Sequence, residues 1–164
     1  MAEHITQERL KHLLHYDTET GVFTRRVDVG KNAKKGAVVG CPNDKGYLRV
    51  VLDGRLYALH RLAVLYVDGV IHDGDVDHAN GDKTDNRWQN LRACTRSQNA
   101  ANAKVQRNNS CGLKGASKDR GGKWRSQIST KGKKIFLGLF DTPEEAHEAY
   151  FAAAQKYHGE YARA

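Results

Sequence analysis

The sequence lacks the features that would place it in a membrane or an oxidising compartment. No apolar run approaches the ~18 residues that a membrane-spanning helix needs. The N-terminus has neither the basic region nor the apolar core of a signal peptide. The three cysteines, Cys41, Cys94 and Cys111, form no CxxC pair, which argues against a four-cysteine zinc site. We therefore expect a cytoplasmic protein with reduced thiols, no structural zinc and no membrane partner.

Positive charge, by contrast, is present in excess and is unevenly distributed. The 164 residues, enough for one domain or two small ones, carry a formal net charge of +8. Residues 1–100 contain 15 Lys and Arg against 13 Asp and Glu, a net of +2, whereas residues 102–134 contain 10 against 1, a net of +9. Such a segment favours a polyanionic partner, most often nucleic acid, although basic surfaces also aid solubility.

Capping and turn signals predict short elements in the first seventy residues. Asp53-Gly54 interrupts an alternating stretch, and this pair accepts the positive φ angles of a tight type I′ turn. Thr6 can act as a helix N-cap. The expected elements are a helix after Thr6, a strand over 22–26, a hairpin over 47–59 and a helix over 60–69.

A second pattern begins after residue 110. Three strands are expected there, over 112–117, 123–130 and 133–140. A helix follows, because Thr142 is an N-cap, Pro143 suits the first helical position and Glu145 completes a capping box. Its alanine-rich face, which includes Tyr157, predicts close packing on the three-stranded sheet.

Residues 76–99 gather side chains that suit phosphodiester chemistry. The oxygens of Asp77 and Asn99 suit a hard cation such as Mg²⁺, and the neutral imidazole of His78 can accept a proton from water. Neighbours on a strand face opposite sides, so Asp77 and His78 can share a site only where the strand ends or twists. The alternative interpretation is a surface turn with ordinary capping side chains.

The stretch DH…NGDKTDNRWQNL…TRSQN resembles the HNH endonuclease motif, the ββα-metal fold, in its phage and intron-encoded homing variant. The resemblance implies a metal-dependent DNA endonuclease or nickase in a phage-infected bacterial host. In it His78 is the general base, Asn90 holds the loop by hydrogen bonds, and Asp77 and Asn99 bind one divalent metal, Mg²⁺ first and Mn²⁺ as the alternative.

Further side chains around this motif have two interpretations each. Arg61 and Arg87 are candidates for phosphate contacts, with ordinary surface arginines as the alternative. His60 matches a histidine that precedes the motif in these relatives. A structural hydrogen bond is the favoured interpretation of His60 over a phosphate or metal contact.

Residues 112–161 resemble the plant ethylene-response-factor (ERF) type of DNA-binding domain, through GLKG, GKWRSQI, LGLFDTPEEAHEAY and HGEYA. The resemblance implies that a three-stranded sheet with one helix binds double-stranded DNA. Alternation along the strands places basic, amide and aromatic groups on one outer face. Arg125 and Gln127 are the candidates for base contacts and Phe136 is the exposed aromatic; the phosphate candidates are Lys114, Lys123, Lys133 and Lys134. A solvated basic face is the alternative.

Together these expectations define an α+β protein, with a ββα-metal (HNH) nuclease unit followed by a three-stranded antiparallel sheet packed on one helix. The predicted domains are 1–59, an α/β lead-in with a hairpin; 60–104, the nuclease core; 105–111, a linker; and 112–164, the ERF-like module. We expect a monomer or weak dimer. A non-catalytic DNA-binding regulator with a degenerate nuclease fold is the alternative function, against which the intact motif argues.

Overall fold

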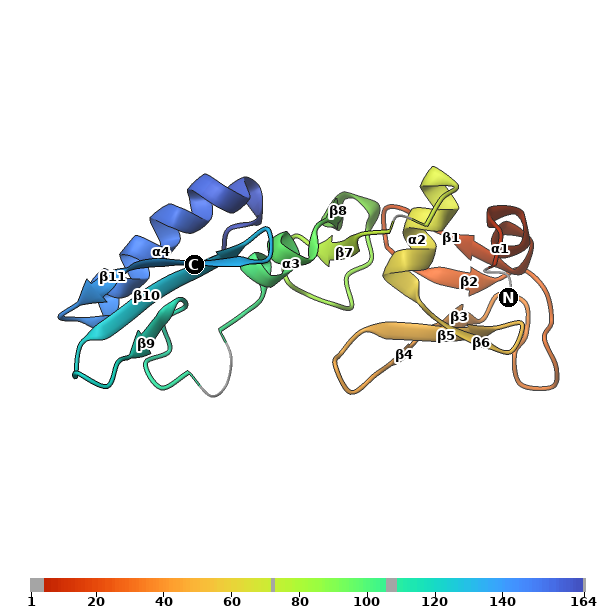
Figure 1. Cartoon of the computed structure of the whole chain (residues 1–164). Helices are drawn as coiled ribbons and strands as arrows, with labels where there is room; N and C mark the ends of the chain where they lie inside the picture. Colours follow the sequence, from red (N-terminus) through yellow and green to blue (C-terminus); the bar gives the residue numbers. More distant parts are fainter. Residues whose placement is uncertain (1–4, 72, 106–108, 164) are drawn as a thin grey trace. The chain divides into compact units, whose positions relative to one another are not determined.

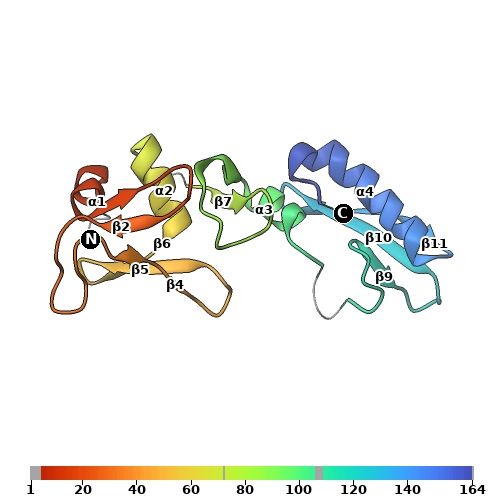
Figure 2. The ribbon, with the colours of Figure 1, turned by 180° about the vertical axis from the view of Figure 1, so that it is seen from behind.

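The protein is a mixed α+β fold of short elements, described over residues 5–71, 73–105 and 109–163 of a computed structural model (Figures 1 and 2). It divides into two compact units, Met1–Ala93 and Cys94–Ala164. The predicted combination of helices with small antiparallel sheets is confirmed. In the described ranges, no helix is both long enough and apolar enough to cross a bilayer.

The first unit is built from small sheets packed with two helices. Strands pair in the orders β1-β2-β3 and β4-β5-β6, and β7 pairs with β8. The elements are α1 (Gln7–Leu13), β1 (Leu14–Tyr16), β2 (Phe23–Arg25), β3 (Val38–Val39), β4 (Cys41–Pro42), β5 (Leu48–Leu52), β6 (Arg55–Ala58), α2 (Leu59–Asp68), β7 (Asp75–His78), the 3-10 turn η1 (Trp88–Asn90) and β8 (Leu91–Cys94), whose last residue belongs to the second unit.

Local signals account for the boundaries of these elements. The Thr6 side chain accepts the backbone N–H of Arg9, as its predicted capping role requires. Asp53 and Gly54 have φ angles of 47° and 77°, the positive values of a type I′ turn between β5 and β6. Helix α2 ends at Gly69 in the left-handed conformation. All three predictions are confirmed.

One apolar core joins the lead-in elements to the β7–β8 pair. Leu10, Phe23 and Leu62 are at most 1% exposed, and Val76 of β7 belongs to the same cluster. Rings also meet: Tyr16 stacks on Phe23 with centroids 4.5 Å apart. The motif strand β7 is therefore supported by residues that precede the motif in the chain.

The second unit is a three-stranded antiparallel sheet that packs on one long helix. The sheet order is β11-β10-β9, and the capping box at Thr142 is present, with Glu145 as its partner. Helix α3 contacts α4 and η2. The elements are α3 (Arg96–Asn102), β9 (Ala116–Lys118), β10 (Trp124–Thr130), β11 (Lys133–Phe140), α4 (Pro143–His158) and the 3-10 turn η2 (Gly159–Tyr161).

Two details of this unit differ from the sequence prediction. The strand expected over 112–117 covers only Ala116–Lys118. Gly115, just before it, has φ +79°, which is not a strand conformation, and its backbone lies against the ring of Tyr150. A Cβ at Gly115 would come within 2.0 Å of Tyr150. Tyr157, predicted on the buried face of α4, is 42% exposed, and His158 is buried instead. Residues 106–108 of the predicted linker lie outside the described residues.

Candidate functional site

Asp77 and His78, the last two residues of strand β7, contact different partners. Asp77 and His78 are 5% and 3% exposed, so both sides of the strand end are covered. Asp77 meets Arg92 of β8, whose Nε and Nη2 donate to its Oδ2 at 3.0 and 2.9 Å. The His78 ring instead meets Asn86, with Nε2 3.2 Å from Oδ1. The alternation expected for strand neighbours is thus retained at the strand end.

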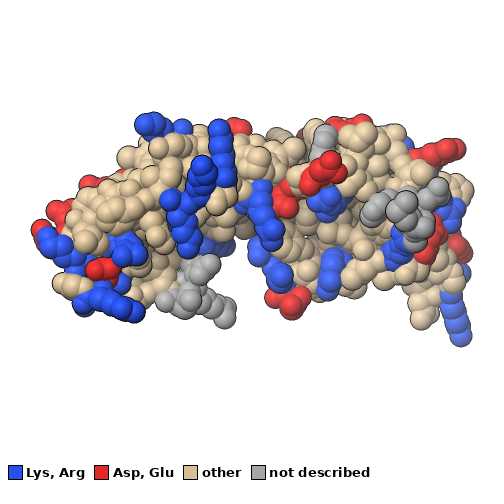
Figure 3. All heavy atoms as spheres, in the orientation of Figure 1, with Lys and Arg blue, Asp and Glu red and all other residues tan. Residues whose placement is uncertain are grey.

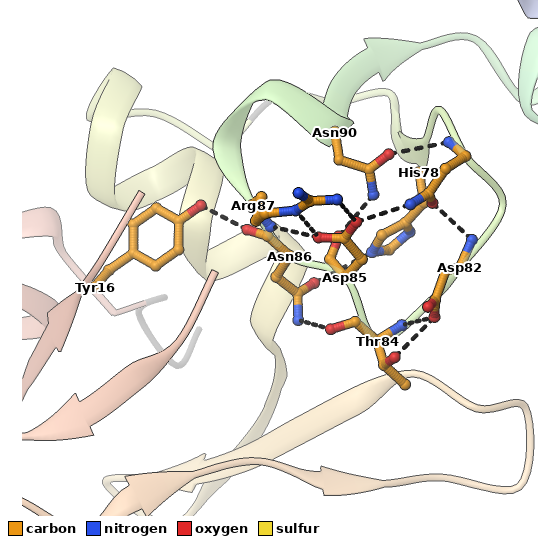
Figure 4. A network of polar contacts seen from close by, with 9 residues as sticks. Tyr16, His78, Asp82, Thr84, Asp85, Asn86, Arg87 and Asn90 are labelled. Atoms are coloured by element: carbon orange, nitrogen blue, oxygen red, sulfur yellow. Dashed lines mark hydrogen bonds and ion pairs between the residues drawn. The ribbon is translucent and has the colours of Figure 1, made fainter. Parts of the chain in front are cut away.

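Asn90 holds the loop that follows β7, as Figure 4 shows. Its Oδ1 accepts the backbone N–H of Asn80 at 3.0 Å, and its Nδ2 donates to the carbonyl of Asp85 at 2.7 Å. The Asn90 carbonyl also accepts the N–H of Ala79 at 2.9 Å. One buried amide therefore spans both ends of the loop. This geometry agrees with the loop-holding role that the motif resemblance implies for Asn90.

Side chains inside the loop add a second layer of hydrogen bonds. Asp82 Oδ1 accepts the N–H and the hydroxyl of Thr84 at 2.9 and 2.7 Å. Asp85 accepts the Asn80 amide at 2.7 Å and a bidentate pair from Arg87 at 2.8 and 2.6 Å. The bond to Arg87 is the main cause that lowers the pKa of Asp85 to about 2. These bonds hold the loop in one conformation, and the ionised carboxylate of Asp85 is their central acceptor.

The His78 ring lies among three other side chains. Its centroid is 5.2 Å from that of His60 and 5.9 Å from that of Tyr47, and Asn86 contacts its Nε2. Burial is the main cause that lowers the pKa of His78, against the opposing effect of the Asn86 hydrogen bond. The imidazole is therefore held neutral at pH 7, which is the form that can accept a proton.

The third motif position, Asn99, lies half-buried on α3 in the second unit. Thr95 caps this helix with a full capping box, in which Gln98 is the reciprocal partner. Ser97 Oγ donates to the carbonyl of Ser129 in β10 at 3.1 Å. The helix that carries Asn99 is thus bonded to the C-terminal sheet.

Lys114, a predicted phosphate contact, has partners within the second unit. Its Nζ donates to the carbonyls of Ala101 and Ala103, the latter at 2.6 Å, at the C-terminal end of the helix. Carbonyls in the last turn of a helix have no hydrogen-bond partner within that helix, so the Lys114 ammonium supplies the missing donor at the end of α3. Burial lowers the pKa of Lys114 to about 8. The Lys114 ammonium therefore stabilises the C-terminal end of α3 within the second unit.

The outer face of the β9–β11 sheet carries four of the predicted DNA-binding residues, Arg125, Gln127, Lys134 and Phe136. Phe136 is 60% exposed, and the Arg125 guanidinium lies 5.9 Å from its ring centroid. Gln127 is paired across the strands with Phe136, and a register shift after Ser126 brings exposed Leu139 opposite Arg125. Lys133 and Lys134 are exposed. Basic, amide and apolar groups therefore share one face.

Several predicted DNA contacts already have acidic or carbonyl partners. Arg87 pairs with Asp85, Lys123 Nζ lies 3.1 Å from Asp141, and Arg125 Nη2 lies 3.1 Å from Asp119. Arg61 Nη1 donates to the carbonyl of Gly74 at 3.1 Å. Exposed pairs of this kind exchange partners at little cost. On the face shown in Figure 3, basic side chains lie over both units and are interspersed with acidic ones.

Sequence reasoning missed three residues of the site. It interpreted Asn86 only as a turn former, and it gave no role to Arg92 or Tyr16. Tyr16 donates its hydroxyl to the carbonyl of Asn86 at 2.7 Å (Figure 4). No sequence pattern links Tyr16 to Asn86, which lies 70 residues further along the chain. The run TDNR was a usable signal for Asn86, since an amide there can reach back to the strand end.

These features define a small α+β protein with a polar, loop-braced strand pair followed by a helix. Residues 57–101 match the family model of HNH endonucleases. Comparison with curated proteins gives no match. Among solved structures, the HNH homing endonuclease I-HmuI, studied for DNA binding and cleavage, is 24% identical with a TM-score of 0.41; the aligned part covers 54% of this chain and 50% of that one.

The donor set at the motif suits a hard divalent cation. Asp77 offers a carboxylate and Asn99 an amide oxygen, and Mg²⁺ is commonly bound by one or two such groups together with water and phosphate. Among the described residues, no group of three or more His, Cys, Asp or Glu could enclose a metal.

Proposed function

We propose that the chain is a metal-dependent DNA endonuclease or nickase of the HNH homing type. The observation that carries the proposal is the match of residues 57–101 to the HNH family, which includes Asp77, His78, Asn90 and Asn99. The buried, neutral imidazole of His78 and the loop held by Asn90 support it. The homing endonuclease I-HmuI, which binds and cleaves DNA, supplies the substrate class by analogy.

His78 is proposed to accept the proton of the attacking water, because its neutral ring has a basic nitrogen in a site that excludes bulk solvent. Asp77 and Asn99 would hold one divalent metal, with Mg²⁺ or Mn²⁺ as candidates. When bound, that metal neutralises charge developing on the phosphate and the leaving oxygen. Arg92 orients the Asp77 carboxylate, and Asn90 keeps the loop in place around the base.

We further propose that residues 112–164 form an ERF-like module that binds double-stranded DNA through the outer sheet face. Arg125 and Gln127 would contact base edges beside the exposed Phe136, and Lys123, Lys133 and Lys134 would contact phosphates. Arg61 and Arg87 are proposed phosphate contacts of the nuclease core, residues 60–104. The acting species is a monomer or weak dimer.

Cleavage of supercoiled plasmid DNA tests the proposal. The full chain with Mg²⁺ or Mn²⁺ is expected to give nicked or linear product, and EDTA is expected to abolish it. His78→Ala removes the base and should lower the rate by a factor on the order of 10² to 10⁴.

His15→Ala is the matched control, since His15 is an exposed histidine of the same unit outside the motif. Cleavage by this variant should equal that of the wild type. Wild-type rates from His78→Ala would contradict the assignment of the base. Full cleavage in EDTA would contradict the metal requirement.

A further inference from the structure

A chain of contacts runs from the first hairpin of the protein to the ring of His78. Tyr16 is 3% exposed at the end of β1, and its hydroxyl donates to the carbonyl of Asn86 at 2.7 Å. Asn86, itself 1% exposed, places its Oδ1 3.2 Å from Nε2 of His78. All three residues lie in the first compact unit.

The turn between β1 and β2 lies directly against the backbone of the motif loop. A Cβ at Gly21 would come within 2.4 Å of the Arg87 nitrogen and 2.5 Å of the Asn86 carbonyl carbon. Thr18 accepts the N–H of Trp88 at 2.9 Å. The hairpin and the loop are therefore in backbone contact, and residue 86 has little freedom to move away from β1.

The orientation of the Asn86 amide determines which nitrogen of His78 bears hydrogen. The Asn86 Nδ2 donates to the carbonyl of Thr84 at 3.4 Å, which leaves Oδ1 to face the imidazole. Oδ1 is an acceptor only, so Nε2 must be the protonated nitrogen, since two facing acceptors in a buried position are unfavourable. In the neutral ring the basic lone pair is then on Nδ1.

We propose that Asn86 and Tyr16 are positioning residues of the nuclease: Asn86 fixes the Nε2–H tautomer and ring orientation of His78, and Tyr16 holds Asn86 in place. The inference rests on the proposed role of His78 as the base, and it names the residues that orient the ring of that base. Asn86 is 1% exposed, so we assign it a positioning role through His78 and no contact with DNA of its own.

Nuclear magnetic resonance of the imidazole nitrogens tests the tautomer directly. In full-length, metal-free wild type above pH 7, ¹⁵N signals of His78 should show a protonated Nε2 and an unprotonated Nδ1. The chain has eight histidines, and the His78→Ala variant identifies the signals that belong to His78. In Asn86→Ala the two nitrogens should move toward a mixture of tautomers.

Steady-state cleavage gives the second readout. Asn86→Ala is expected to lower kcat by about 10- to 100-fold with KM unchanged, as misplacement of a catalytic group does. Asn86→Asp keeps an acceptor oxygen, so it should retain the wild-type ¹⁵N pattern and recover part of kcat. Tyr16→Phe should shift both readouts in the same direction by a smaller amount.

Tyr57→Phe is the matched control for Tyr16→Phe. The Tyr57 hydroxyl accepts the N–H of Ile5 at 3.3 Å in the same unit, so its loss removes one hydroxyl bond without touching the loop. This variant should keep the wild-type ¹⁵N pattern and kcat. Thermal unfolding of each variant separates lost positioning from lost folding.

An Asn86→Ala protein that folds with the wild-type tautomer, or with the wild-type kcat, overturns the proposal. If that variant does not fold, Tyr16→Phe decides, and unchanged ¹⁵N signals there overturn it. Wild type that cuts no DNA would refute the proposed function alone, because the tautomer is measured without cleavage.

Discussion

His60 shows how burial at a single residue can decide its chemistry. Its Nδ1 is buried and has no hydrogen-bond partner among the described residues, so the structural hydrogen bond predicted for His60 is not present at that atom. Its ring instead lies 5.0 Å from that of Tyr47 and 5.2 Å from that of His78. Burial is the main cause that lowers the pKa of His60 to about 4.

This burial predicts a specific pH dependence of folding. The unfolded chain binds a proton on His60 below its ordinary pKa of 6.5, whereas the folded chain does so only near pH 4. Stability from the neutral ring is therefore complete above pH 6.5 and is lost as pH falls toward 4. The 2.5-unit difference between those two values corresponds to about 3 kcal/mol.

Urea unfolding between pH 4 and 7 measures this effect. The variant His60→Phe keeps a ring but cannot titrate, so its unfolding free energy should vary less with pH than that of the wild type. His78, Arg61 and Asp75 are the charged groups that act on His60, and the variant retains all three. His15→Gln, at an exposed position, should behave as the wild type. Equal slopes for wild type and His60→Phe would refute the assignment.

At the scale of the element, α3 depends on the second unit for its stability. It has seven residues, which is too short for an isolated helix in water. Its capping box supports the first turn, while Lys114 satisfies carbonyls at the other end. Ser97 adds a bond to β10.

Lys114→Met should therefore destabilise the second unit by about 1 to 3 kcal/mol, the range for hydrogen bonds to a charged group. Thermal unfolding followed by circular dichroism would measure it. Lys118→Met removes the same charge from an exposed position of β9 and should leave the midpoint within about 2 °C, as surface substitutions do. Equal midpoints for the two variants would argue that Lys114 has no structural role.

Elements with local signals could be predicted from the sequence, and those with long-range causes could not. Thr6, Thr142 and the Asp53-Gly54 turn act on neighbours within a few residues, so their helices and hairpin were correctly expected. The two-residue strands β3 and β4 have no periodicity of their own and form only by pairing with β2 and β5.

The same division applies to the candidate site. Asp77, His78 and Asn99 were proposed from residue type and spacing, and the resemblance to the HNH motif added Asn90. Tyr16 lies 70 residues before its partner Asn86, and no sequence pattern predicts that contact. The bonds from Lys114 to the end of α3 were not predicted either, because they form only when the helix packs on the rest of the unit.

For the whole molecule, the charge distribution predicts how DNA affinity depends on salt. Each lysine that contacts a phosphate adds about 0.9 to the slope of log affinity against log salt. Removing Lys133 or Lys134 by substitution with alanine should reduce the slope by about that amount, without changing sequence preference. Arg125→Ala or Gln127→Ala should instead relax the preference for particular bases.

Fluorescence anisotropy across a salt series would measure the slopes. Lys156→Ala makes the same charge change on α4, away from the sheet strands, and should leave the slope unchanged. A slope that falls equally for Lys156→Ala, Lys133→Ala and Lys134→Ala would mean that only net charge matters. That result would contradict binding through the sheet face.

Several supports of the motif lie outside the segment that matches the HNH family model. The loop after β7 is held by Tyr16, Thr18 and the bare backbone of Gly21, while α3 is held by Lys114 and Ser129. Residues 57–101 alone contain none of these groups. The matched segment is therefore not self-sufficient: a fusion that grafts only those residues onto a foreign DNA-binding protein would inherit the proposed catalytic side chains without part of the scaffold that orients them.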